Sequence, residues 1–147
     1  MINQQQVDLL KQESATLWNT WREKHHNIAI ELDGVDLSEA NLGEVNLAGA
    51  DLSQANLREA DLNNANLNKA RLVGADLSGA NLAGADLSDA DLQEANLHKA
   101  YLTGANLVGA NLRGAMLFKA HLNWVMLEGT LITPEQVSQV KLESDHL

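Results

Sequence analysis

Histidines, serines and carboxylates are the side chains with which this chain could perform acid–base or metal chemistry. None of its histidines has acidic partners at metal-ligand spacing, and the sequence contains no cysteine that could complete a zinc site. The serines recur at positions that we expect to be exposed corners, with no pocket to shelter a reaction. The sequence therefore predicts no catalytic residue, no metal and no cofactor, and hence no enzyme. The histidines are His25, His26, His98, His121 and His146.

The net charge of −10 disfavours direct nucleic-acid binding, because contacts to phosphates depend on Lys and Arg. The charge is uneven, since residues 30–64 carry eight acids and one arginine, whereas residues 95–133 carry one acid and three bases. The first ten residues lack the features of a secretory signal, and no apolar run approaches the ~20 residues of a membrane span. We therefore expect a soluble, cytoplasmic protein without a membrane partner.

A repeat of five residues occupies most of the chain. Leucine stands at every fifth position from Leu32 to Leu127, a small or apolar residue precedes it by two positions, and Asn or Asp usually lies between them. Five residues advance an α-helix by about 500°, so these leucines would form no stripe on a helix. In a flat strand an odd spacing places successive leucines on opposite faces. The pattern instead predicts a chain that turns one corner per repeat, a solenoid with Leu and Ala inside.

Two residues follow each leucine and form the corner. Nine of the ten glycines occupy the second of these positions, which suits the positive φ of a type II turn. Other repeats place Glu39, Glu59, Lys69 or Lys99 there. For these we expect a second turn type that needs no positive φ.

The middle-position aspartates indicate how many corners make one coil. Stacked positions in a ladder lie about 4.8 Å apart, so like charges should avoid stacking. Coils of three or five repeats would stack several of these aspartates on one another, whereas a coil of four repeats stacks none of them. Among the middle positions of a four-repeat coil, the one carboxylate clash is Glu31 over Asp51. Four repeats per coil therefore give about five 20-residue coils, roughly 24 Å tall.

The pattern A-[ND]-L-x-x, as in ADLSQANLREADLNNANL at residues 50–67, resembles the pentapeptide-repeat protein family. The resemblance covers residues 30–132 and implies a right-handed quadrilateral β-helix. It is strongest to small bacterial members, common in photosynthetic bacteria, that have a Trp-containing first helix like LWNTWREKH and a closing segment like LITPEQVSQ. The expected architecture is an all-β solenoid at 30–132 between an N-terminal capping helix at 1–29 and a short C-terminal helix and tail at 133–147.

Helical spacing predicts one helix over residues 4–25, with Val7, Leu10, Leu17, Trp18 and Trp21 along one side. We expect its indoles to cover the first coil. The alternative, a helix on a membrane surface, lacks the Lys/Arg face of such helices.

At the other end, Thr133, Pro134 and Gln136 form a predicted helix start with a capping box. This helix should run to about Lys141 with Val137 and Val140 as apolar contacts, and the last six residues should lack order.

The repeat lapses near its C-terminal end, where outward positions become large or apolar. Tyr101 and His121 should stack one coil apart. Two interpretations stay open: the C-terminal helix covers some of these side chains, or they form an interface for a partner or a homodimer through the C-terminal end. The possible interface residues are Tyr101, Met116, Phe118, His121, Trp124 and Met126.

The function predicted from these features is a non-enzymatic structural or protein-interaction scaffold. The alternative is an acidic DNA mimic that inhibits a type II topoisomerase, a role that the family resemblance implies for some members. The net charge favours this alternative, but the carboxylates concentrate at one end, and the repeat centre is never Phe.

Overall fold

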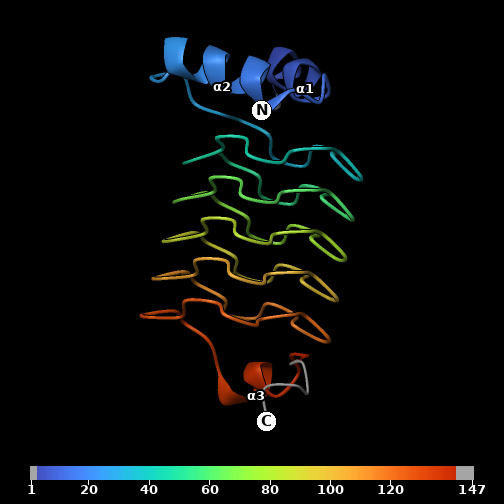
Figure 1. Cartoon of the computed structure of the whole chain (residues 1–147), viewed down its shortest axis with the longest axis vertical. Coiled ribbons are helices and arrows are strands. Elements are labelled where there is room, and N and C mark those ends of the chain that lie inside the picture. The colour runs from blue at the N-terminus through green and yellow to red at the C-terminus, as the bar shows by residue number, and fades with distance from the viewer. Residues whose placement is uncertain (1–2, 142–147) are drawn as a thin grey trace.

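The computed structural model describes residues 3–141, which form a stack of coils with helices at both ends (Figure 1). Helices α1 (Gln4–Leu10) and α2 (Ala15–Lys24) lie at one end of the stack, and α3 (Pro134–Val137) lies at the other. No helix within this described part is long and apolar enough to cross a membrane.

Parallel bridges between equivalent residues of successive coils hold the stack together, from Glu31 with Asp51 to His121 with Lys141. Each bridge is isolated, so along residues 3–141 the sides of the coils contribute single bridge residues rather than longer strands. This is the register that the aspartates favour, because Arg71 lies between Asp51 and Asp91 and aspartates elsewhere pair with asparagines.

The backbone hydrogen bonds repeat with the same period. The N–H of Leu62 donates to the carbonyl of Asn81 in the next coil (2.7 Å), and the N–H of Asn64 donates to that of Ala83 (2.9 Å). The turn itself is closed by the N–H of Ala65, which donates to the carbonyl of Leu62 (3.0 Å). Because each coil is bonded to the coils above and below it, each side chain lies over the side chain at the same position of the next coil.

The corners differ from our expectation of two turn types. The second corner residue has a positive φ in all twenty repeats, at nine glycines and at eleven other residues, including Glu39 (59°), Glu59 (55°), Lys69 (59°) and Lys99 (57°). A left-handed conformation costs a non-glycine residue about 1–2 kcal/mol. Two hydrogen bonds offset that cost: the bond that closes the turn, and the bond from this residue's own N–H to the next coil. The coil therefore imposes one backbone geometry on whichever residue occupies the second corner position.

The interior is filled by the repeat leucines and the small residues two positions before them. The leucines from Leu32 to Leu117 are 1% exposed or less. The prediction that all twenty leucines lie inside fails only at the last, because Leu127 is 38% exposed where the stack ends. Full burial of one leucine contributes about 1.5–3 kcal/mol, so the leucine column provides most of the apolar stabilisation.

The N-terminal segment forms two helices rather than the single predicted helix. The first ends at Leu10, and Glu13 has a positive φ of 55°. Ser14 then caps α2 by accepting the N–H of Leu17 (3.2 Å). This cap starts a new helix, and Leu17 lies 48% exposed rather than on the buried side.

Both helices bond to the otherwise open backbone edge of the first coil. The fully buried Trp18 donates its indole N–H to the carbonyl of Asn46 (2.7 Å). Gln6 donates to the carbonyl of Ala29 (2.9 Å) and accepts the N–H of Glu31 (3.1 Å). Side chains of the two helices therefore bond to backbone groups that a preceding coil would otherwise pair, and an exposed edge of this kind needs such partners.

The C-terminal helix starts as predicted and ends early. The capping box of Thr133 and Gln136 is present, and the Gln136 amide also donates to the carbonyl of Leu112 (2.6 Å). The helix ends at Val137, which is 46% exposed. The predicted extension to Lys141 is wrong, since the N–H of Lys141 donates to the carbonyl of Ala120 (2.7 Å) and rejoins the ladder. The predicted disorder of the last six residues lies outside the described residues.

We expect Leu82→Ala to lower the free energy of unfolding by about 2–5 kcal/mol, because its side chain is fully buried between coils and its loss leaves a cavity. Thr103→Ala, at an exposed corner, should cost less than about 0.5 kcal/mol. Urea unfolding of both variants measures the difference. Equal losses would contradict the assignment of inside and outside.

Candidate interaction surface

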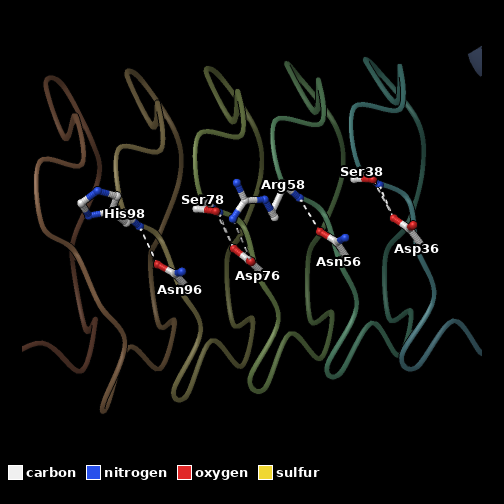
Figure 2. Close-up of polar contacts among 8 residues, drawn as sticks. All are labelled: Asp36, Ser38, Asn56, Arg58, Asp76, Ser78, Asn96 and His98. Atoms are coloured by element: carbon white, nitrogen blue, oxygen red, sulfur yellow. Dashed lines mark hydrogen bonds and ion pairs between the residues drawn. The ribbon is translucent and has the colours of Figure 1, made fainter.

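The Asn or Asp before each leucine has a structural role that the sequence interpretation missed. In fourteen corners its side-chain oxygen accepts the N–H of the residue two positions later. Figure 2 shows four such corners stacked on one side, where the bonds measure 3.0–3.2 Å. That N–H belongs to the first corner residue, so the side chain satisfies a donor that neither the ladder nor the turn uses.

The two carboxylates on this side, Asp36 and Asp76, accept hydrogen bonds from nearby donors. Asp36 accepts both the hydroxyl (2.7 Å) and the backbone N–H (3.0 Å) of Ser38, and these bonds hold its pKa below the ordinary value. Asp76 accepts the hydroxyl of Ser78 (2.6 Å) and lies 3.8 Å from the guanidinium of Arg58. These groups stabilise the corners (Figure 2).

The predicted interface residues stand where the corner pattern lapses. Tyr101, Met116, His121 and Met126 replace the Asn or Asp and cannot accept the corner N–H in the same way. The five large apolar side chains lie on the surface, so α3 does not cover them. Their exposed fractions are Tyr101 49%, Met116 51%, Phe118 50%, Trp124 77% and Met126 50%.

Two aromatic stacks run between neighbouring coils on this part of the surface. Tyr101 and His121 stack at 4.7 Å between ring centroids, as the register predicts. His98 and Phe118 stack at 5.3 Å, and Lys119 lies 5.3 Å from the Phe118 ring. The sequence interpretation missed His98, although its place one coil before Phe118 was the available signal. Each ring thereby holds its neighbour in one orientation.

Within residues 3–141, the histidines do not gather into a cluster that could hold a metal ion. Across residues 3–141 no group of three or more His, Cys, Asp or Glu side chains lies close enough to hold an ion, and His146 lies outside that range. A hollow of about 430 Å³ opens on the surface between Asp61 and Tyr101, over Gly79 and Asn81. Its lining combines small side chains with carboxylates, an amide and a phenol, and it suits a protruding side chain better than a sheltered reaction.

The family model described as pentapeptide repeats matches residues 30–68, 70–107 and 95–133. The chain belongs to the pentapeptide-repeat family. Membership implies a right-handed β-helix solenoid, which agrees with the stacked coils and parallel bridges. The comparison with curated proteins finds no match.

Two solved structures of pentapeptide-repeat proteins are similar to this chain. Rfr23 of the cyanobacterium Cyanothece 51142 is 33% identical, with a TM-score of 0.71 over 85% of this chain and 97% of that one. A protein of the Arabidopsis thaliana thylakoid lumen is 34% identical, with a TM-score of 0.64 over 72% of this chain and 70% of that one. The similarity to Rfr23 extends beyond the repeats, because the aligned 85% of this chain is longer than the repeat region at residues 30–132.

The Asn or Asp before each leucine has two proposed roles: it accepts the corner N–H, and the choice between Asn and Asp keeps carboxylates apart. The two roles can be separated at Asn56, which lies between Asp36 and Asp76. We expect Asn56→Ala to cost about 0.5–1.5 kcal/mol, because the N–H of Arg58 loses its acceptor. Asn56→Asp keeps the acceptor but places three carboxylates in a row.

Urea unfolding at low and high salt distinguishes the variants. The Asn56→Asp penalty should shrink at high salt or when the carboxylates are protonated, whereas the Asn56→Ala penalty should persist. A salt-insensitive Asn56→Asp penalty would refute the stacking argument.

Proposed function

We propose that this pentapeptide-repeat protein is a non-enzymatic scaffold that binds another protein through its C-terminal end. The observation that carries the proposal is the set of large apolar side chains about half exposed or more, led by Trp124 at 77%. Exposed aromatic and Met side chains are typical of protein interfaces. The interface comprises Tyr101, Met116, Phe118, His121, Trp124 and Met126.

The interior supports a structural rather than a catalytic role. Leucines fill the axis of the stack, so the rod offers no deep cleft within the repeats. The corner bonds and aromatic stacks hold the surface side chains in fixed positions. A partner would meet a surface that loses little conformational freedom on binding.

The finer architecture that we propose is a quadrilateral of about five coils, each of four repeats, with helical caps. Bridges between equivalent residues of successive coils support the coil length, and four corners fall within each such span. The bonds of Gln6 and Trp18 to the first coil, and of Gln136 beyond the last, support the role of the helices as caps. In such a rod the caps would prevent other chains from pairing with the backbone edges at its two ends.

The proposed partner is a protein. One form of this proposal is a homodimer through the C-terminal end. Neither nucleic acid nor a membrane is proposed as a direct ligand. The acidic net charge supports this exclusion of nucleic acid. A cytoplasmic location is part of the same proposal. The Arabidopsis relative, in contrast, is a thylakoid lumen protein.

The net charge of −10 favours one alternative, a DNA mimic that inhibits a type II topoisomerase. The distribution of the charge opposes it, because residues 30–64 alone carry −7, from eight acids and one arginine, and residues 95–133 are net basic. A gyrase supercoiling assay tests this: under the scaffold proposal we expect no inhibition at micromolar protein. Inhibition would favour the mimic.

Replacing both Phe118 and Trp124 by Ala should abolish partner capture without unfolding the rod, because both side chains are exposed. Affinity capture from the native lysate and thermal unfolding measure the two effects. Val73→Ala combined with Val108→Ala, at corners away from this end's aromatic stacks, is the matched control. If the double aromatic variant captures the same partner as the wild type, the proposed interface is wrong.

A further inference from the structure

One edge of the solenoid carries a run of charges that reverses sign halfway along. We call it the charged edge; it comprises Glu39, Glu59, Gly79, Lys99 and Lys119, each one coil from the next. They occupy the second corner position, and the four charged side chains are exposed. The N–H groups of the first four donate to the coil below, which places the five residues one over another, and the N–H of Lys119 donates to the carbonyl of Gln139.

The charged edge breaks the rule that the bridge positions follow. There, aspartates alternate with asparagines, whereas here Glu39 stacks on Glu59 and Lys99 on Lys119. Adjacent like charges destabilise a ladder. In the other three columns of second corner residues no two like charges are adjacent. Within the rod these like-charged neighbours therefore repel one another, although Lys119 also lies over the Phe118 ring.

The side next to the charged edge changes character at the same level. Its outward residues run from Asn41 and Asp61 through Asn81 to the stacked Tyr101 and His121. The midpoint of both columns is the level of Gly79 and Asn81. The acidic half of this surface is thus followed by a basic and aromatic half of equal length.

We propose that a second copy of this chain binds this surface side by side and antiparallel, with the two-fold axis at the level of Gly79 and Asn81. This inference rests on the proposed function, since the surface includes the Tyr101 and His121 of the proposed interface. It names the partner and its orientation.

An antiparallel copy with this axis pairs each charge of the charged edge with its opposite. Glu39 meets Lys119 of the second copy, Glu59 meets its Lys99, and Gly79 meets Gly79. Both rods have the same rise per coil, so the register holds along the whole edge. A parallel copy would place Glu on Glu and Lys on Lys, so the charges select the antiparallel orientation.

The hollow on this side receives the aromatic ring of the second copy. The same symmetry sets Asp61 opposite Tyr101 of the second copy, and Asp61 and Glu59 line one end of the 430 Å³ hollow. The phenol O–H of that Tyr101 donates to the Asp61 carboxylate. The small residues Gly79 and Ala83 leave the room that the ring needs.

One side of a solenoid is narrow and its ion pairs are exposed, so the dimer is weak and salt-sensitive. Sedimentation velocity over a range of protein concentrations, at low and high ionic strength, measures it. The wild type should dimerise at low salt and dissociate at high salt. Lys99→Glu with Lys119→Glu should be monomeric, and so should Glu39→Lys with Glu59→Lys.

Mixing these two double variants provides the decisive test. One carries only acids on the charged edge and the other only bases, so each repels itself and an equal mixture should form a heterodimer. The matched control is Lys69→Glu with Arg113→Glu, which makes the same change in net charge as the Lys99 and Lys119 variant, at exposed positions on other corners, and should still dimerise. Far-UV circular dichroism confirms that each variant is folded.

A wild type that is monomeric at every concentration and salt overturns this inference, as does a mixture that forms no heterodimer or a control that also dissociates. The proposed function fails separately, when the Phe118 and Trp124 double variant captures the same partner as the wild type. If the dimer persists in both charge variants but is lost on Trp124→Ala, the result would support the C-terminal interface and refute the antiparallel register.

Discussion

The ladder that joins equivalent residues of neighbouring coils is the constraint on which the rest of this structure depends. It fixes the spacing of the coils, imposes a positive φ on every second corner residue, and makes each surface side chain the direct neighbour of two others. Both the leucine-filled axis and the aromatic stacks of His98 with Phe118 and Tyr101 with His121 follow from that spacing. Surface chemistry on this rod is therefore organised in columns.

Much of the architecture could be predicted because the repeat encodes it directly. Leucine at every fifth position excludes helix and flat strand, and the aspartates alone point to four repeats per coil. The corner at Glu39 could not be predicted from that residue's own preference, because the ladder determines its φ. The break before α2 was missed because the apolar spacing from Val7 to Trp21 continues across it, while the cap at Ser14 lies between.

The residues of the proposed interface were predicted from lapses in the pattern, but their exposure could not be predicted. Whether Trp124 is covered depends on the path of the chain after residue 132, and the helix α3 turns instead towards Leu112 and Ala115 through Gln136. The charged edge was also missed. Glu39 and Lys119 are separated by four coils and show a relationship only once the columns are aligned.

The corner hydrogen bond from Asn or Asp has a consequence for how the surface charge of such rods can vary. Asp and Asn have nearly the same shape, and either oxygen accepts the same corner N–H, as Asp36 and Asn56 do in neighbouring coils. Exchanging one for the other changes the charge by one unit and leaves the backbone in place. The rod thus separates its electrostatic pattern from its geometry, so chains of one identical shape can present different patterns of charge to different partners.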